Sequence, residues 1–383
     1  MRLVVLSLIV LLACSLAAAQ SGRRIAPTST PAPLAPASDD EPLPYSESRP
    51  SRRRYVPPSP ASPIQAAVLS PSTDSTASGD EDIVKVETSL VTIPVSVFDR
   101  NGLYIPGLSK ENFKIFEDGR EQQIAYFGTQ DKPFTVALVL DTSPSTHYKI
   151  DEIHHAAKAF VDQLGPNDSV IVIEFNSSVK VQCQRTTDRQ KIYKGIDKAK
   201  FGDGTSLYNA VDEALRKQLS KIEGRKAVVL FTDGVDTTSR KNSYDNTVAY
   251  AEESDALVFP IYYNTYMDNR FGGGGIFGGG IIGAGTSAEE YAVGKKYLED
   301  LADVTGGRVF QPEAVPGGLE RAFEGIAEEL RRQYNIGYVP DTEGKPGQRK
   351  SIKVRVDRPN LIIRARDSYI VGAARPVPTP AQK

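Results

Sequence analysis

The feature that most constrains the fold is a repeated alternation in the middle of the chain. Short apolar runs, each long enough for one strand, alternate with segments whose apolar residues recur at helical spacing. The runs are FTVALVL, SVIVIEF, KAVVLFT and ALVFPIY, and the helical segments include KIDEIHHAAKAFVDQL, SLYNAVDEALRKQL, KKYLEDLADVTG and GLERAFEGIAEELRRQY. Runs that are apolar throughout are typical of parallel strands covered by helices on both faces. Residues 131–333 are therefore predicted to form an α/β domain with a doubly wound, mostly parallel sheet.

The segments on either side of this domain have a different pattern. Residues 83–130 and 334–372 alternate apolar and polar side chains, with turn pairs at Asn101-Gly102 and Asp118-Gly119. This alternation predicts antiparallel strands and hairpins. Because the two ends of a compact domain commonly lie close together, the α/β domain can be inserted between these flanks. We predict that the β-rich flanks join in one β-sandwich. The run SSVKVQCQRT also alternates, and it predicts an antiparallel edge strand on the α/β sheet.

The N-terminus has the pattern of a secretory signal. Arg2 precedes an apolar core from Leu3 to Leu12 and the small residues Ala17 to Ala19. Cleavage after Ala19 makes residues 1–19 a signal peptide, and the alternative is a lipoprotein signal that ends before Cys14. Both alternatives predict a secreted, periplasmic or cell-envelope protein, and the second adds a lipid anchor as its one contact with the membrane.

Two further segments have the composition of disordered chain. Residues 20–82 are rich in Pro, Ser, Ala and Thr, and residues 373–383 form a similar tail. Such segments cannot bury enough apolar area to offset the entropy lost on ordering. We predict a disordered linker and a disordered tail.

Oxygen-bearing side chains follow the carboxyl ends of two predicted strands. FTVALVL is followed by Asp141, Ser143 and Ser145, KAVVLFT is followed by Asp233, and FGDGTSLYNAV places Thr205 at the start of a helix. The carboxyl ends of neighbouring parallel strands meet at one edge of a sheet. Carboxylates and hydroxyls are suitable ligands for a hard cation such as Mg²⁺. Two aspartates balance a divalent charge, so the ion can still accept a carboxylate from another molecule. The alternative is that DTSPST only caps the next helix.

The motifs DTSPS, GDGTSLYNAV and FTDGVDT, in this order and on these elements, resemble the metal-ion-dependent adhesion site of Rossmann-like von Willebrand factor type A domains. The resemblance covers residues 132–333. It implies that Ser143, Ser145 and Thr205 coordinate the cation directly, while Asp141 and Asp233 act mainly through water or through contacts with the direct ligands. An acidic group of a partner would complete the coordination. The flanks resemble those of the acidobacterial-type, von Willebrand factor A-related proteins of bacteria.

Residues around these positions are candidates for a surface that contacts the ligand. They are Thr142, His147, Asp203 and Thr237. A solvated loop is the alternative for Thr237. The glycine-rich insert at residues 271–285 follows the strand ALVFPIY and lacks the lysine of a phosphate-binding loop. It is interpreted either as a mobile loop or as a loop that caps the binding surface.

The resulting hypothesis is a non-catalytic, extracytoplasmic binding module. It would bind Mg²⁺, with Mn²⁺ or Ca²⁺ as alternatives, and a protein or peptide with an exposed Asp or Glu. A structural envelope protein with a stabilising metal, or a metal-dependent hydrolase, are the competing hypotheses. The hydrolase lacks support because the motif contains neither a G-x-S-x-G turn nor a positioned general base. With 46 Lys and Arg against 48 Asp and Glu, the net charge of −2 gives no reason to expect nucleic-acid binding.

Overall fold

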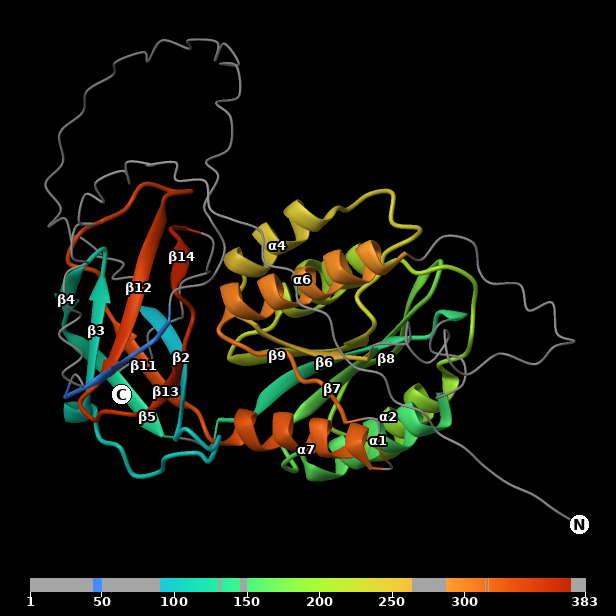
Figure 1. Cartoon of the computed structure of the whole chain (residues 1–383), viewed down its shortest axis with the longest axis horizontal. Helices are drawn as coiled ribbons and strands as arrows, with labels where there is room; N and C mark the ends of the chain where they lie inside the picture. Colours follow the sequence, from blue (N-terminus) through green and yellow to red (C-terminus); the bar gives the residue numbers. More distant parts are fainter. Residues whose placement is uncertain are drawn as a thin grey trace, which may run out of the picture. The chain divides into compact units, whose positions relative to one another are not determined.

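The computed structural model describes residues 44–49, 90–129, 132–144, 150–263, 287–313, 315 and 317–372. The described residues form one mixed sheet from the middle of the chain and two antiparallel sheets from its flanks (Figure 1). Three predicted segments lie outside them, namely the signal at residues 1–19, the glycine-rich insert at 271–285 and the tail at 373–383.

The central sheet confirms the predicted doubly wound α/β arrangement. Its strand order is β10-β9-β6-β7-β8. The strands are β6 (Phe134–Asp141), β7 (Ser169–Phe175), β8 (Val179–Thr186), β9 (Arg225–Thr232) and β10 (Leu257–Tyr262). β6 pairs in parallel with β7 and β9, and β9 pairs in parallel with β10. β8 runs antiparallel to β7 at the edge, as the alternation of its sequence predicted.

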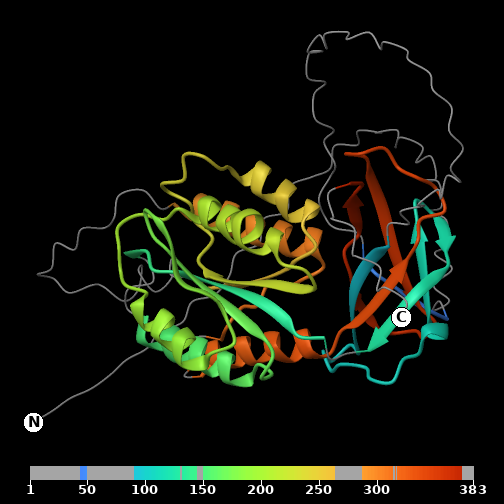
Figure 2. The ribbon, with the colours of Figure 1, turned by 180° about the vertical axis from the view of Figure 1, so that it is seen from behind.

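Helices cover both faces of this sheet (Figures 1 and 2). One face carries α1 (Ile150–Gln163), α2 (Arg189–Lys198) and α7 (Gly318–Arg331), and the other carries α3 (Leu207–Asp212), α4 (Tyr244–Glu253) and α6 (Ala288–Thr305). Alternate residues of one strand enter opposite cores, since Val136 and Leu138 of β6 pack with α1 and α7 whereas Ala137 packs with α3 and α6. α3 continues through a π-helix at Glu213–Gln218 into a 3-10 turn at Leu219–Lys221.

Two of these helices were not among the predicted segments, although both carry start signals. Asp188 precedes α2, and its side chain accepts hydrogen bonds from the backbone N–H groups of Gln190 and Lys191. Ser243 precedes α4 and forms a capping box with Asn246. Side-chain capping of this kind satisfies N–H groups that have no partner inside a helix.

The flanks form two antiparallel sheets that share one core. The first has the order β1-β12-β3-β4 with β14 also on β12, and the second has the order β13-β2-β11-β5. Their strands are β1 (Ser46–Glu47), β2 (Val91–Phe98), β3 (Phe113–Glu117), β4 (Arg120–Gln122), β5 (Ile124–Thr129), β11 (Tyr334–Tyr338), β12 (Arg349–Val356), β13 (Ile362–Arg364) and β14 (Ser368–Ile370). A short 3-10 helix, Lys110–Asn112, precedes β3. Ile93, Ile115 and Val354 are among the residues of the shared core, so the predicted sandwich is present.

The α/β domain is inserted between two neighbouring strands of the sandwich. β5 leads into it and β11 leads out of it, and the two strands pair with Thr129 opposite Tyr334. The ends of the inserted domain therefore meet in one ladder, which is the geometry expected when a compact domain is inserted.

One part of the predicted linker is ordered. Within residues 20–82, Ser46 and Glu47 form strand β1 on the edge of β12, so the prediction of disorder is wrong for this segment. A strand of two residues is too short to show a period in the sequence. Its side chains match β12 specifically, as when Tyr45 packs under the Arg355 guanidinium.

Across the residues that the structure describes, every helix is too short or too polar to cross a membrane.

Candidate functional site

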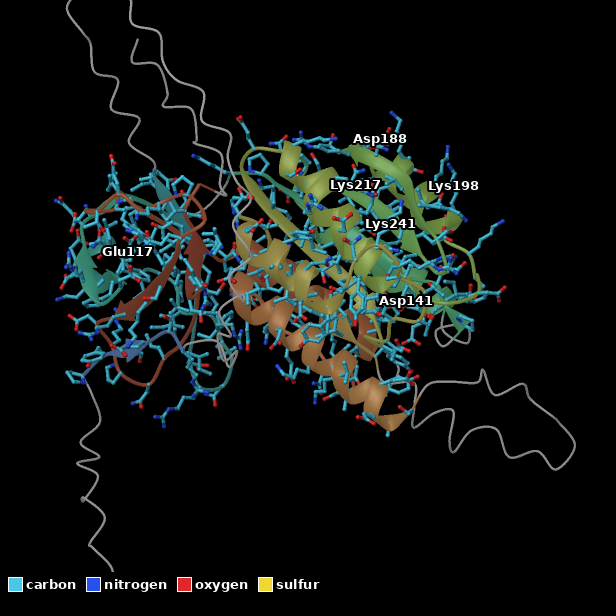
Figure 3. The ribbon with its side chains drawn as sticks, turned by 90° about the horizontal axis from the view of Figure 1, so that it is seen from above. Glu117, Asp141, Asp188, Lys198, Lys217 and Lys241 are labelled. Atoms are coloured by element: carbon cyan, nitrogen blue, oxygen red, sulfur yellow. The ribbon has the colours of Figure 1, made fainter. Side chains whose placement is uncertain are left out.

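Asp141 is the last residue of β6 and is completely buried. Its Oδ1 accepts the backbone N–H of Ser143 at 2.9 Å, and its Oδ2 accepts the Thr232 hydroxyl at 2.7 Å. Ser143 is 1% exposed. Because Thr232 ends the neighbouring strand β9, its bond to Asp141 joins the ends of β6 and β9. Figure 3 shows Asp141 in the α/β domain.

Asp233 follows β9 and begins a tight turn. Its Oδ1 accepts the N–H of Val235 at 3.1 Å, and the N–H of Gly234 donates to the Thr232 hydroxyl at 3.1 Å. Gly234 has φ of 84°, and a Cβ at this position would lie 2.7 Å from the backbone of Gly294 in α6. Glycine is therefore required both by the left-handed backbone and by the close approach of α6.

Thr205 lies in the loop that leads to α3, and the turn after β9 holds it in place. The N–H of Thr205 donates to the Thr237 hydroxyl at 2.9 Å, and the N–H of Thr237 donates back to the Thr205 carbonyl at 2.9 Å. At the other end of the loop, the N–H of Gly202 donates to the carbonyl of Thr142 at 3.1 Å. The loop is thus bonded to the ends of both β6 and β9.

The turn after β9 also caps α3. The N–H of Tyr208 donates to Asp236 Oδ2 at 3.0 Å, and the N–H of Asn209 donates to the Ser239 hydroxyl at 3.1 Å. These side chains satisfy N–H groups of the first helical turn, which have no partner inside the helix. Thr205 therefore lies just before a helix whose first turn is held by side-chain hydrogen bonds.

The two carboxylates interact through their charges. Burial, and then the charge of Asp233, raise the pKa of Asp141 to about 7, while hydrogen bonds from Ser143 and Thr232 act in the opposite direction. Two buried carboxylates that repel each other are stabilised by a cation placed between them. The donor set is carboxylate and hydroxyl oxygen, which suits a hard divalent ion. The described ranges contain no group of three or more His, Cys, Asp and Glu side chains that could hold a metal.

The sequence of this region matches a known domain family. Residues 136–235, from β6 to the turn after β9, match the family model of the von Willebrand factor type A domain. The chain contains a von Willebrand factor type A domain. The match includes Asp141, Ser143, Thr205 and Asp233, and the α/β fold of residues 134–331 agrees with it.

Solved structures similar to this chain include several von Willebrand factor type A proteins. The vWF domain of the type V pili tip protein Mfa5 from Porphyromonas gingivalis has 12% identity and a TM-score of 0.41, over 53% of this chain and 96% of its own. A von Willebrand factor type A protein from Catenulispora acidiphila has 13% identity and a TM-score of 0.40, over 73% and 74%. Proximal thread matrix protein 1 from mussel byssus, solved with a zinc-occupied MIDAS motif, has 16% identity and a TM-score of 0.39, over 57% and 50%. Comparison of the sequence with curated proteins gave no match.

Four of the five predicted ligands of the type A domain lie at one edge of the sheet. They are Asp141, Ser143, Thr205 and Asp233, and all four are buried. The fifth, Ser145, lies outside the described residues, as does His147 of the predicted ligand surface. Their role as metal ligands stays a prediction.

The remaining surface candidates divide into two kinds. Thr142 is completely buried, and its hydroxyl donates to the Phe175 carbonyl at 3.1 Å, so its prediction as a surface residue is wrong. Side chains of a strand alternate between faces, and the position after Asp141 points back toward β7. Asp203 and Thr237 are exposed beside Thr205 and stay candidates.

Three supporting residues were missed at the sequence level. Thr232 bonds Asp141, Asp236 caps α3, and Asn176 holds the end of β7 against the Thr205 loop. Asn176 is 5% exposed, its Nδ2 donates to the Thr142 hydroxyl at 3.3 Å, and its carbonyl accepts the N–H of Ser206 at 2.7 Å. The sequence signal for Asn176 was its position as a polar residue directly after the buried run SVIVIEF.

Proposed function

We propose that this chain is a non-catalytic binding module whose type A domain uses a bound divalent cation to hold an acidic side chain of a protein or peptide partner. The cation would be Mg²⁺, with Mn²⁺ or Ca²⁺ as alternatives. Its ligands would be Asp141, Ser143, Ser145, Thr205 and Asp233. The observation that supports the proposal is that Asp141 and Asp233, two buried carboxylates that repel each other, follow neighbouring strands, with buried Ser143 and the Thr205 loop bonded beside them.

The protein's own contribution is preorganisation. Thr232 fixes one oxygen of Asp141, the turn at Gly234 fixes Asp233, and Thr237 fixes the loop of Thr205. When bound, the cation supplies positive charge that can accept a carboxylate oxygen of the partner. Binding then needs no further basic residue from this chain.

The pattern of residues 1–19 supports an extracytoplasmic setting for this module. Secretion exposes the type A domain to partners outside the cytoplasm, and lipidation at Cys14 would hold it at a membrane surface. We therefore place the proposed binding event in the envelope or outside the cell.

A pull-down from envelope and secreted fractions tests the proposal. Full-length chain is immobilised in Mg²⁺ or in chelator, as wild type, as Asp141→Ala and as Asp188→Asn. Asp188 is an exposed helix cap well apart from Asp141 (Figure 3), and asparagine also caps helices, so this variant is the matched control. We expect a partner retained by wild type and by Asp188→Asn in Mg²⁺, and lost in chelator and with Asp141→Ala.

A melting curve of each variant separates loss of binding from loss of fold. Retention that persists in chelator and in folded Asp141→Ala would contradict the proposal. Metal-dependent stability without a metal-dependent partner would favour the structural alternative. Turnover of a phosphate ester by purified wild type, absent in Asp141→Ala, would favour the hydrolase.

A further inference from the structure

Residues 44–49 fill a part of the β12 edge that β14 leaves open. β14 pairs with β12 at residues 349–351, and β1 pairs with it at Arg355 and Val356. The opposite edge of β12 is occupied by β3. An open edge presents unpaired backbone groups that can pair with another chain. The segment 44–49 therefore completes this sheet.

The inward side of the segment is held by hydrogen bonds from two serines. Ser48 donates its N–H to the Val354 carbonyl at 2.8 Å, and its hydroxyl accepts the N–H of Val354 at 2.9 Å. The Ser46 hydroxyl donates to the Arg358 carbonyl at 2.7 Å and accepts the N–H of Leu361 at 2.9 Å. Both serines are buried, Ser46 at 8% and Ser48 at 5% exposure. They satisfy backbone groups of β12 and of the turn that follows it.

The outward side is held by one aromatic and one acidic residue. The Arg355 guanidinium lies 3.9 Å from the centre of the Tyr45 ring. Arg355 also donates to Glu47 at 2.7 Å, and the Lys353 ammonium lies 3.3 Å from Glu47. The edge thus recognises the pattern Tyr-Ser-Glu-Ser, with hydroxyls facing in and the ring and carboxylate facing out.

This segment is separable from the rest of the fold. The contacts described above all join it to residues 353–361, and none of its side chains belongs to the apolar core of the sandwich. Forty residues, 50–89, connect it to Leu90. A connection of that length spans up to roughly 130 Å when extended. The segment can leave its place without opening the core, and it can reach a neighbouring molecule.

We infer that this part of the β12 edge is a strand-acceptor site, and that residues 44–49 of a second copy of the chain occupy it in exchange for the resident segment. Reciprocal exchange joins two copies. The resident segment competes with an effective concentration on the order of a millimolar, because it is tethered. Exchange between wild-type copies therefore occurs where copies are crowded to about that level. The inference does not depend on the metal site.

A peptide experiment tests the acceptor site. The probe is a labelled peptide of residues 43–50, LPYSESRP, added to full-length wild type and to full-length Ser48→Pro. Proline removes the N–H that pairs with Val354 and so weakens the resident segment, while the edge itself is unchanged. We expect saturable binding to Ser48→Pro and binding at least about tenfold weaker to wild type, whose own segment competes. Failure of the peptide to bind Ser48→Pro, or equal binding of a peptide carrying the same proline, overturns the inference.

A charge exchange tests whether a second copy is the occupant. In one chain, Glu47→Arg places a positive charge in the segment against the basic edge residues Lys353 and Arg355. In a second chain, Lys353→Glu with Arg355→Glu places negative charges on the edge against Glu47. When the two variants are mixed, the segment of each chain has the charge opposite to that of the other chain's edge. We expect sedimentation velocity to show monomers for each alone and dimers for the mixture, with monomers when all three changes are in one chain. A mixture that sediments as the sum of its components overturns exchange between copies.

Discussion

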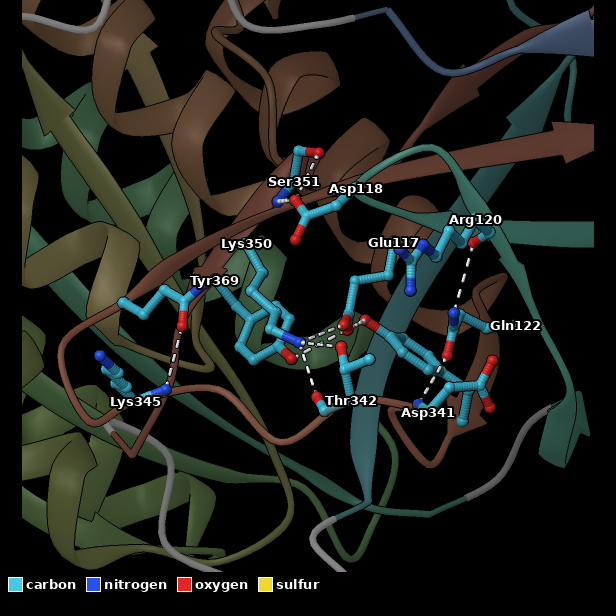
Figure 4. A network of polar contacts seen from close by, with 12 residues as sticks. Glu117, Asp118, Arg120, Gln122, Asp341, Thr342, Lys345, Lys350, Ser351 and Tyr369 are labelled. Atoms are coloured by element: carbon cyan, nitrogen blue, oxygen red, sulfur yellow. Dashed lines mark hydrogen bonds and ion pairs between the residues drawn. The ribbon is translucent and has the colours of Figure 1, made fainter.

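The sandwich and the type A domain each bury carboxylate charge within a polar cluster, but they balance that charge differently. In the sandwich, Glu117 is 3% exposed and accepts the Lys350 ammonium at 2.6 Å (Figure 4). The phenols of Tyr338 and Tyr369 donate to its other oxygen at 2.7 and 2.9 Å. In the type A domain, Asp141 instead faces the like charge of Asp233.

This difference distinguishes a structural cluster from a site prepared for a ligand. Burial and the Glu117 carboxylate raise the pKa of Tyr369, so that phenol stays a protonated donor and the sandwich cluster supplies its own cation and donors. At Asp141, burial and then the neighbouring charge of Asp233 raise the carboxylate pKa to about 7. A cation from outside relieves that repulsion, whereas the Glu117 cluster gains little from one. Each prediction below tests this contrast.

The largest expected effect is on the sandwich cluster. Lys350→Met leaves the Glu117 carboxylate buried without its ammonium, and we expect the free energy of unfolding to fall by about 3–5 kcal/mol. Urea unfolding measures it. Lys345→Met, at an exposed lysine of the loop that precedes β12, is the control and should change stability by less than about 0.5 kcal/mol. A similar small loss for Lys350→Met would show that its ammonium does not balance Glu117.

The second effect concerns pH in the type A domain without metal. An unfolded aspartate has a pKa of about 3.9, whereas folded Asp141 has a pKa of about 7. Between these values the unfolded chain binds fewer protons than the folded chain, so the free energy of unfolding falls as pH rises. The stabilisation is complete below pH ~4 and is lost by pH ~7, on the order of 2–4 kcal/mol.

Urea unfolding in chelator at several pH values measures this loss. Asp141→Asn is the matched variant, because an amide does not titrate, and it should lose less stability over the same range. Identical pH profiles for the two chains would contradict the raised pKa.

The third effect is stabilisation by metal. Mg²⁺ at about one hundred times its dissociation constant should add ~2.7 kcal/mol to the free energy of unfolding. Asp233→Asn should lose this increment, since it removes one of the two charges. Lys350→Met should keep it, although its starting stability is lower. Equal increments in wild type and Asp233→Asn would remove the distinction between the two clusters.

The smallest effect is at a supporting hydroxyl. Thr232→Val removes the donor to Asp141 and the acceptor for the Gly234 N–H, so it should cost about 1–2 kcal/mol and weaken Mg²⁺ binding. Thr232→Ser keeps the hydroxyl and should lie closer to wild type. Calorimetric titration with Mg²⁺ compares the three chains. If valine binds Mg²⁺ as tightly as threonine, the hydroxyl does not position Asp141.

The features predicted from sequence were those encoded by local pattern. Continuous apolar runs predicted β6, β7, β9 and β10, because a strand buried on both faces needs apolar residues throughout. The convergence of Asp141 and Asp233 followed from the parallel pairing of their strands.

What the sequence did not show depends on partners far along the chain. Asn176 matters because its carbonyl accepts the N–H of Ser206 from another loop. Strand β1 is held by Arg355, which lies more than three hundred positions further along the chain. Neither relation leaves a periodic signal. Thr142 was assigned to the ligand surface as a residue adjacent to Asp141 and Ser143, although its hydroxyl turns inward and donates to the Phe175 carbonyl.

The pairing of Thr129 with Tyr334 has a consequence for how the chain folds. About 200 residues separate these positions, so closing the β5–β11 ladder in an unfolded chain carries the entropy cost of a very long loop. An α/β domain that folds first holds its own two ends together and removes most of that cost. The inserted domain would then act as the template on which the sandwich assembles, and mutations that slow its folding would also delay the sheets on either side of it.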